Sequence, residues 1–334
     1  MWGEPALLGA VILGALILYV LFGGADFGGG VWHLCAVGPR ASQQRALIAE
    51  AIGPIWEANH VWLILVVVVL FTGFPPAYAE ISIRFHAPLL ALLLAIVARG
   101  AAFAFRSASG ERTRERRGWG GVFIAGSVAS PLLLGMIAAA LVAGEVGAGL
   151  TPARLGWSGP WLTPFALAAG LFALALCAFL AAVYLTVEAE GAPDLQEDFR
   201  RRALASGIAC GVLALATFLL SEAGAPRVYQ GLSLRRWSWP LHGATALAAV
   251  TALVAVAGRR FRLARLAAAA QVALVILGWG ASQYPFVVVP DLTLAAASAP
   301  RATQTLLLAT LGAGALVLFP SLRLLFRVFK SRPR

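Results

Sequence analysis

Nine long apolar stretches run through this chain of 334 residues and constrain its fold more than any other feature. A helix needs about 20 mainly apolar residues to cross the roughly 30 Å of hydrocarbon in a lipid bilayer. The nine stretches span residues 5–27, 54–74, 78–105, 121–142, 163–187, 203–221, 240–257, 263–281 and 304–328. The longest gap between them, at 143–162, is interpreted as a loop, because it is too short for a soluble domain. We therefore predict an all-α integral membrane protein with nine transmembrane helices, in which residues 1–334 form a single membrane domain.

The low charge content excludes several classes of soluble protein. Hydrophobic residues make up 60% of the chain and charged residues only 12%, whereas soluble domains average about 25% charged residues. A water-exposed surface needs more charge than this, so a cytosolic enzyme, a secreted disulfide scaffold and a disordered chain are excluded. Cys35, Cys177 and Cys210 lie far apart and form no CxxC pair, which argues against a disulfide framework and a thiolate metal site.

The basic residues predict how the chain is oriented in the membrane. Cytoplasmic loops of membrane proteins are enriched in Lys and Arg. If successive spans cross the membrane in alternate directions, 19 of the 26 basic residues fall on one side of the membrane and six on the other, and Arg99 lies inside a span. The larger group is Arg40, Arg45, Arg106, Arg112, Arg114, Arg116, Arg117, Arg200, Arg201, Arg202, Arg259, Arg260, Arg262, Arg265, Arg323, Arg327, Lys330, Arg332 and Arg334, and the smaller is Arg84, Arg154, Arg227, Arg235, Arg236 and Arg301. We therefore expect the N-terminus outside and the C-terminus in the cytoplasm, and the basic stretch 111–117 indicates topology and not a nucleic-acid partner.

Two carboxylates lie where membrane helices seldom carry charge. Asp26 lies at the predicted cytoplasmic end of the first span among five glycines, and Glu57 follows Pro54 in the first turns of the second span. Ionisable residues within spans are costly and usually mark a pathway or an ion pair. The alternative for Asp26 is an interfacial acid beside a glycine-rich helix end. The alternative for Glu57 is a carboxylate that the helix dipole stabilises.

Asn59 and His60 add an amide and an imidazole to the same region of the sequence. Because a short loop joins the first two spans, we expect both residues to lie on the same membrane face as Asp26 and Glu57. Two acids, an amide and an imidazole on the cytoplasmic face are typical of a proton relay. We therefore predict a proton pathway along Glu57, Asp26, Asn59 and His60, with no catalytic residue in this chain.

The histidines are poorly placed to bind haem. His33 and His60 fall near the predicted cytoplasmic side, His86 and His242 fall near the outer side, and Met136 is the only internal methionine. Each histidine also fits an interfacial position, and no Cys/His spacing indicates another metal. We expect no haem ligand, no metal site and no directly bound cofactor in this chain.

Two further charged features lie in or between the spans. Arg99 and Arg106 are two turns apart and share one helix face. Arg106 can reach the interface, whereas Arg99 is deeper and is expected to contact a carboxylate or a cofactor headgroup. The segment 283–293 contains two prolines and Asp291. A rigid loop that anchors the last two spans is favoured there over a ligand-binding role.

Four segments resemble subunit II of the cytochrome bd-type quinol oxidases. They are Gly-Ala-Asp-Phe-Gly at 24–28, Gly-Pro-Ile-Trp-Glu-Ala-Asn-His-Val-Trp at 53–62, the arginine-rich stretch after the third span, and Gln-Tyr-Pro-Phe through Asp-Leu-Thr at 283–293. They occur in order along the nine spans, so the resemblance covers essentially the whole chain. The resemblance implies two four-helix bundles, at 5–142 and 163–281, with a peripheral ninth helix at 304–328. It also implies a haem-free chain paired with a subunit I that holds haems b and d, or b only, and the quinol site.

The same resemblance implies an activity and a location. The two subunits would oxidise quinol and reduce dioxygen to water in the bacterial cytoplasmic (inner) membrane, electrogenically but without proton pumping, with protons drawn from the cytoplasm. The family also implies contacts with lipid and quinone, in some relatives a structural quinone, and room for a small single-helix accessory subunit. The family proton path runs through the position of Glu57. Many relatives have Asp-Gly-Asn-Gln where this chain has Glu-Ala-Asn-His, so Glu57 keeps the carboxylate and His60 adds a titratable group.

Two other interpretations stay open. A polytopic secondary transporter also needs charges within its spans, but its site usually lies near the bilayer midplane between broken helices, whereas the acids here lie at one interface. A purely structural scaffold for subunit I predicts the same partner. It differs only in how the protein responds to substitution of its carboxylates.

Overall fold

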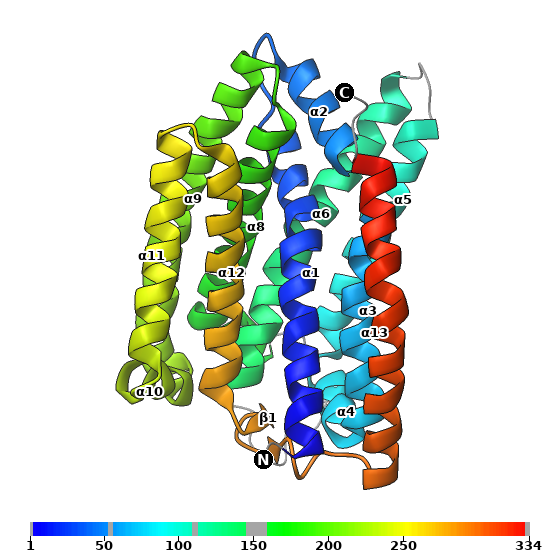
Figure 1. Ribbon diagram of the computed structural model, residues 1–334, viewed down its shortest axis with the longest axis vertical. Coiled ribbons are helices and arrows are strands. Elements are labelled where there is room, and N and C mark those ends of the chain that lie inside the picture. Colours follow the sequence, from blue (N-terminus) through cyan, green and yellow to red (C-terminus); the bar gives the residue numbers. More distant parts are fainter. Residues whose placement is uncertain (1–2, 53–55, 109–112, 145–158, 331–334) are drawn as a thin grey trace.

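The computed structural model describes residues 3–52, 56–108, 113–144 and 159–330, and this part of the chain is almost entirely helical (Figure 1). The helices of the first half are α1 (Glu4–Leu34), α2 (Ala41–Ile52), α3 (Trp56–Gly73), α4 (Pro75–Arg84), α5 (His86–Ala108) and α6 (Thr113–Ala143). The 3-10 turn η1 (Pro160–Leu162) precedes α8 (Pro164–Glu188), α9 (Pro193–Gly224), α10 (Pro226–Leu234), α11 (Ser238–Ala257), α12 (Phe261–Gln283) and α13 (Arg301–Lys330).

Most of these helices are long and apolar enough to cross a membrane. Within the described residues, eight helices pass this test: α1, α5, α6, α8, α9, α11, α12 and α13. Together, α3 and α4 form a ninth candidate span that is bent by 117°. The prediction of an all-α, multi-pass membrane protein is confirmed.

The predicted third span, 78–105, begins at the wrong residue. The chain from Pro75 to Arg84 forms a separate helix, α4, and the long apolar helix α5 begins only at His86. Pro75 and Pro76 begin α4 directly after the bend. Proline lacks a backbone N–H and clashes with the preceding turn, so α3 cannot continue through these residues. The predicted boundary at 74–78 coincides with this bend, and the feature that was missed is the second break, at Phe85, between α4 and α5.

The glycine-rich part of α1 is helical, which makes α1 longer than predicted. The helix continues to Leu34, so Asp26 lies about two turns inside it and not at its end. A Cβ atom built at Gly28 would lie 1.9 Å from the carbonyl oxygen of Cys177 in α8. Glycine is therefore required for α1 and α8 to approach this closely. The glycines mark a helix crossing and not the end of a helix.

Helix α1 is central to the packing and contacts α3, α6, α8, α12 and α13. α5 packs along α6, α9 packs along α8, and α11 packs along α12. Helix α8 also packs on α1 and α6, so it joins the two halves of the chain. The division into bundles at 5–142 and 163–281 stays a prediction. The helix predicted to be peripheral, α13, contacts α1 and α3.

At the end of the molecule that carries the N-terminus, a short antiparallel hairpin forms from β1 (Phe286–Val288) and β2 (Leu292–Thr293) (Figure 1). Arg84 of α4 forms ion pairs with Glu80 and with Asp291, and the second joins Nη2 to Oδ2 at 2.9 Å. The Arg84 side chain is only 8% exposed. The segment predicted to be a rigid loop is therefore tied to α4 by a largely buried ion pair.

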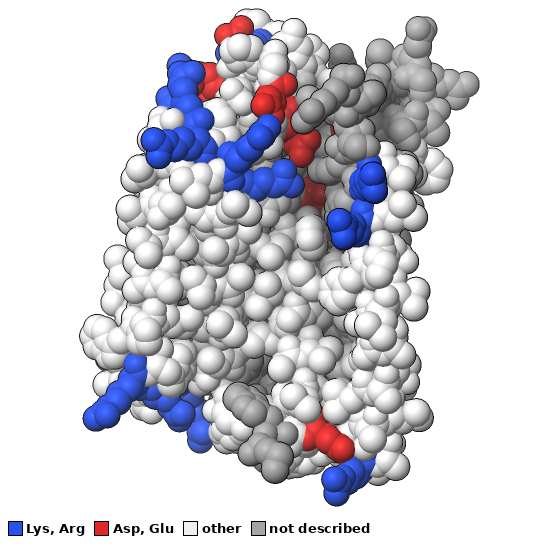
Figure 2. Space-filling view, viewed as in Figure 1, with Lys and Arg blue, Asp and Glu red and all other residues white. Residues whose placement is uncertain are grey.

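The opposite end of the molecule carries most of the described basic side chains and is called the arginine-rich end below (Figure 2). Its arginines are Arg40, Arg45, Arg200, Arg201, Arg202, Arg259, Arg260, Arg262, Arg265, Arg323 and Arg327. Arg40 donates two hydrogen bonds, of 2.9 and 2.6 Å, to the Asp198 carboxylate, and these bonds raise the pKa of Arg40. Gln44 Nε2 donates to the same carboxylate at 2.7 Å. These contacts join α2 to α9, and the location of this end in the cytoplasm stays a prediction.

Candidate functional site

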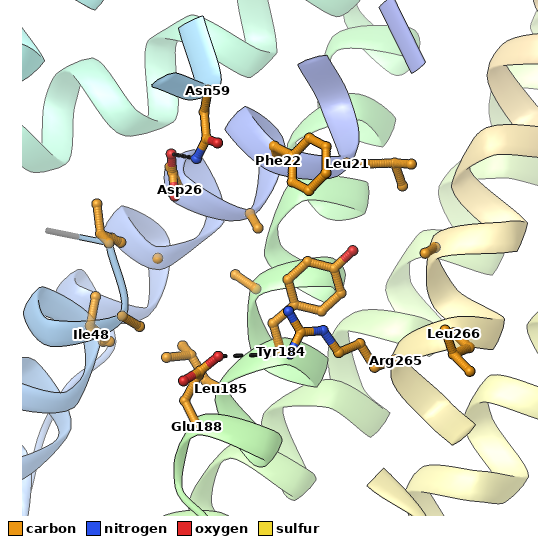
Figure 3. A pocket seen from close by; sticks show the side chains of 16 residues that line it. Leu21, Phe22, Asp26, Ile48, Asn59, Tyr184, Leu185, Glu188, Arg265 and Leu266 are labelled. Carbon is orange, nitrogen blue, oxygen red and sulfur yellow. Dashed lines mark hydrogen bonds and ion pairs between the residues drawn. The ribbon is translucent and has the colours of Figure 1, made fainter. Parts of the chain in front are cut away.

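A buried carboxylate in α1 lies at the centre of the polar cluster. Asp26 is 5% exposed and Asn59 of α3 is 3% exposed. The Asn59 amide donates a hydrogen bond of 2.7 Å from Nδ2 to Oδ2 of Asp26 (Figure 3). The two residues meet because α1 and α3 pack against each other. Burial of a carboxylate is costly unless donors replace its water, and Asn59 provides one.

Arg99 of α5 is the most deeply buried charged residue in the described chain, with 1% of its surface exposed. Its Nη2 donates to the main-chain carbonyl oxygen of Asp26, and its Nε donates to Oγ of Ser127, both at 3.0 Å. The guanidinium carbon lies 4.9 Å from the ring centre of Phe27 and 5.1 Å from that of Phe123. The hydrogen bonds and ring contacts of Arg99 are thus with a carbonyl, a hydroxyl and two aromatic faces, and the Asp26 carboxylate also acts on it electrostatically.

Two glycines explain how α6 brings Ser127 to Arg99. A Cβ atom at Gly30 of α1 would lie 2.1 Å from Cβ of Ser127. A Cβ atom at Gly126 would lie 2.6 Å from the Ala95 carbonyl oxygen of α5. Because both positions lack a side chain, α6 can approach α1 and α5 closely enough for the Ser127 hydroxyl to accept the Arg99 hydrogen bond.

His60 lies beside this cluster in an aromatic environment. Its ring centre is 5.9 Å from that of Tyr19 and 5.8 Å from that of Phe27. The side chain of Tyr19 is 1% exposed, and its hydroxyl has no hydrogen-bond partner among the described residues. Tyr19 precedes Asp26 by two helical turns and therefore lies on the same face of α1, farther from the arginine-rich end.

The predicted proton-pathway residues are brought together as far as the structure describes them. Asp26, Asn59 and His60 lie together at the contact of α1 with α3. Glu57 is in the first turn of α3, and Arg106 is near the C-terminal end of α5. The side chains of Glu57 and Arg106 lie outside the described residues.

A pocket of about 420 Å³ opens beside Asp26. It is lined by residues of α1, α2, α3, α8 and α12. Its polar lining comprises Asp26 and Asn59 at one end, and Tyr184, Glu188 and Arg265 at the other (Figure 3). The walls between the two ends are apolar.

The sequence alone did not single out Tyr19, Ser127, Tyr184, Glu188 or Arg265. The spacing of Tyr19 from Asp26 was a usable signal, since seven residues are two helical turns. Glu188 had a weaker signal, as an acid that directly follows an apolar stretch. Ser127 and Arg265 had none, because their partners lie on other helices far away in the sequence.

The described histidines and Met136 each contact other residues of this chain. Nδ1 of His86 and Nε2 of His242 lie 3.1 and 2.9 Å from main-chain carbonyl oxygens. The ring of His33 packs on an aromatic ring, as His60 does, Met136 lies in an apolar cluster, and none of these side chains lines the pocket. Within the described ranges, no three His, Cys, Asp or Glu side chains are grouped so that they could hold a metal ion.

Comparison with known proteins identifies relatives of this chain. The family model for cytochrome bd terminal oxidase subunit II matches residues 5–329. A Bacillus subtilis protein named cytochrome bd ubiquinol oxidase subunit 2 is 35% identical over 114 residues, which are 34% of this chain and 33% of that protein. The Escherichia coli cytochrome bd-I ubiquinol oxidase subunit 2 is 29% identical over 186 residues, which are 54% of this chain and 48% of that protein. The matched segments thus span a third and about half of these two relatives.

The fold is also known from a solved structure. The bd oxidase from Geobacillus thermodenitrificans contains a chain that superposes with a TM-score of 0.80. The match covers 98% of both chains at 22% sequence identity. At this identity, the likeness shows a shared fold.

Proposed function

The chain belongs to the family of cytochrome bd terminal oxidase subunit II, and on that premise we propose that it is the haem-free, proton-supplying subunit of a quinol:dioxygen oxidoreductase. The partner, subunit I, holds haems b and d, or b only, and these groups supply the oxygen chemistry when bound. Both chains lie in the bacterial cytoplasmic membrane, with the arginine-rich end in the cytoplasm. Reduction of dioxygen draws its protons from that side, which makes the reaction electrogenic without pumping.

The observation that carries the proton role is the buried Asp26 carboxylate beside the pocket. An ionisable group in a membrane span is retained at a cost of several kcal/mol, of the order of 3 kcal/mol at a helix centre. Asp26 is kept in place by the Asn59 amide, while Arg99 binds the main-chain carbonyl of the same residue. A carboxylate held in this way can accept a proton and release it without a change in the surrounding helices.

Glu57 adds a second carboxylate to the proposed path. It lies in the first turn of α3, two residues before Asn59. In this proposal Glu57 loads protons at the arginine-rich end and passes them to Asp26. His60 and Tyr19 lie beyond Asp26 on the way to the interior of the membrane, where they can hold ordered water.

The test is turnover of the assembled complex that carries Asp26→Asn. Loss of a positioned proton carrier typically costs 10²-fold or more, so we expect quinol oxidase turnover to fall by at least about tenfold while the haem spectrum of the complex stays unchanged. Asp26→Glu should retain most of the activity. Unchanged turnover with Asp26→Asn would favour the alternative of a purely structural scaffold for subunit I.

Glu57 is tested in the same complex and by the same assay. Glu57→Ala should slow turnover, because it removes the carboxylate, whereas Glu57→Asp should be tolerated. If Glu57→Ala turns over as the unmodified complex does, Glu57 is not on the path. The transporter alternative is disfavoured because the family match spans nearly the whole chain.

A further inference from the structure

The pocket beside Asp26 links a buried carboxylate to the surface of the molecule. Helices α1, α2, α8 and α12 form most of its walls, and Asn59 of α3 lines its inner end. At that inner end, Asp26 is 5% exposed. A second pocket, of about 190 Å³, is lined by Asn59 and by apolar or aromatic residues of α1, α3 and α13.

A second carboxylate lies at the outer end of the same pocket. Glu188 is the last residue of α8, and Arg265 lies in the first turns of α12, so both are near the arginine-rich end. Oε1 of Glu188 lies 3.7 Å from Nη1 of Arg265, and their side chains are 25% and 38% exposed. The Arg265 guanidinium carbon lies 4.8 Å from the ring centre of Tyr184. Figure 3 shows this ion pair at the opposite end of the pocket from Asp26 and Asn59.

The surface around this outer end is hollowed and charged. Figure 2 shows acidic surface at the back of a hollow near the arginine-rich end, with basic surface beside it. At such a position the Glu188 carboxylate, with a side chain that is 25% exposed, can exchange protons with bulk water, whereas Asp26, at 5%, is far less accessible. The two carboxylates therefore lie at the two ends of one opening.

From this arrangement we infer that protons reach Asp26 through the pocket, and that Glu188 is the carboxylate at its mouth that takes them from the cytoplasm. The inference rests on the proposed role of Asp26 and adds a route that is separate from Glu57. A proton from bulk water adds to the Glu188 carboxylate, passes to water in the pocket and ends on the Asp26 carboxylate. Glu188 is left ionised again and Arg265 stays protonated throughout.

The volume and lining of the pocket fit a short chain of water molecules. One water occupies about 30 Å³ of liquid and needs two to four polar partners, so a pocket of about 420 Å³ has room for several. Asp26 and Asn59 supply partners at the inner end, and Tyr184, Glu188 and Arg265 supply them at the mouth. The apolar walls between them offer water no hydrogen-bond partner, so the water molecules in the middle of the pocket must bond to one another.

Arg265 acts as a positioning residue for Glu188. Its guanidinium lies over the Tyr184 ring and beside the Glu188 carboxylate, so it holds that carboxylate at the mouth of the pocket. A salt bridge at this exposure contributes little stability. We therefore explain this ion pair as a contact that positions the Glu188 carboxylate and not as one that stabilises the fold.

The test compares Glu188→Gln with Glu190→Gln in the complete complex. Glu190 lies two residues further on, pairs with Arg262 at 3.3 Å, has a side chain that is 63% exposed and does not line the pocket. The measurement is the rate of proton uptake from the cytoplasmic side after an oxygen pulse to the quinol-reduced complex in vesicles. We expect Glu188→Gln to slow uptake by about tenfold, Glu188→Asp to restore most of it, and Glu190→Gln to match the unmodified complex.

A pocket-filling variant tests the route without removing a charge. Ala269 of α12 lines the pocket and is half-buried, so Ala269→Phe should block water and slow uptake as Glu188→Gln does. Normal uptake in both Glu188→Gln and Ala269→Phe would overturn the inference and would indicate a pocket filled by a hydrocarbon chain. If Asp26→Asn is slow in the same assay, the proposed function stands without this route. If Asp26→Asn is also normal, the proposed function itself fails.

Discussion

At the scale of single residues, Arg99 is the most deeply buried charge of the described chain. Its hydrogen bonds go to the carbonyl of residue 26 and the hydroxyl of Ser127, and the Asp26 carboxylate also acts on it electrostatically. Two aromatic rings cover its faces. Arg99 therefore holds the backbone of α1 at the residue that carries the proposed proton carrier.

This role predicts that Arg99→Met destabilises the complex. Removal of a buried charged group that satisfies several partners typically costs about 3 kcal/mol or more, and here it removes one donor each from the Asp26 carbonyl and the Ser127 hydroxyl. Thermal unfolding of the purified complex should show a lower Tm. Ser127→Ala removes one hydrogen bond and should cost only about 1 kcal/mol. Equal Tm values for Arg99→Met and Ser127→Ala would contradict this role.

Part of the site could be predicted from the sequence at this scale. Asp26 and Asn59 were expected to lie on the same membrane face, and they are hydrogen-bonded. The connection between their helices contains the helix α2 and is therefore longer than the short loop expected. Tyr19 and His60 lie next to each other through the same helix pair. Helix packing decides which distant segments meet. The contact of Arg99 with residue 26 could therefore not be predicted, nor could the fact that Glu188 and Arg265 line the same pocket as Asp26.

At the scale of helices, hydropathy predicted where the spans lie but not how they bend or cross. The bend between α3 and α4 falls at the predicted boundary between 54–74 and 78–105, but the separate helix α4 and its break from α5 at Phe85 were not predicted. The sequence left open whether the glycines after Asp26 form a helix end, and they lie inside α1 at its crossing with α8. A single sequence does not distinguish a glycine at a helix end from a glycine at a helix crossing, because the crossing depends on which other helix packs there.

The helix crossing predicts a specific effect of Gly28→Ala. The added methyl group would lie 1.9 Å from the Cys177 carbonyl oxygen, so α1 and α8 must move apart. Overpacking of this kind typically costs about 1–3 kcal/mol, and the amount of complex that survives purification should fall with its Tm. Gly14→Ala is the matched control on the same helix, since nothing lies within 4 Å of its added Cβ. If Gly14→Ala lowers Tm as much as Gly28→Ala does, the effect is not due to this crossing.

The hairpin contact makes a prediction at the other end of the molecule. Asp291→Ala leaves the largely buried Arg84 guanidinium with fewer partners, so we expect a loss of about 1–3 kcal/mol in stability. The control is Glu4→Ala: the Glu4 carboxylate lies 3.8 Å from Arg301, whose side chain is 90% exposed, so the arginine left behind is solvated and stability should change by less than about 1 kcal/mol. The comparison is made by thermal unfolding of the complex. Equal losses would show that the hairpin does not depend on Arg84.

At the scale of the whole molecule, the distribution of basic side chains distinguishes the two ends. The orientation of the molecule in the membrane is inferred from that distribution. The described arginines gather mainly at one end (Figure 2), and the positive-inside rule assigns that end to the cytoplasm. The proposed proton source depends on this assignment, because both Asp26 and the pocket mouth lie toward the arginine-rich end.

The native cysteines allow this orientation to be tested. Cys35 is exposed near the arginine-rich end, whereas Cys177 and Cys210 are buried. A membrane-impermeant maleimide should therefore label the complex at Cys35 in inside-out vesicles but not in right-side-out vesicles. The control is Ala296→Cys, an exposed position at the other end, in a Cys35→Ser background, and it should show the reverse pattern. Labelling of Cys35 in right-side-out vesicles would place the proton route on the wrong side of the membrane.

The most direct test of the account is whether Asp26 itself changes its protonation during the reaction. Infrared difference spectra of the assembled complex, recorded between its reduced and oxidised states, report carboxyl groups that gain or lose a proton. The account predicts a carboxyl band that disappears with Asp26→Asn and persists with Glu190→Gln. A spectrum with all its carboxyl bands intact in Asp26→Asn would contradict the claim that protons pass through this residue.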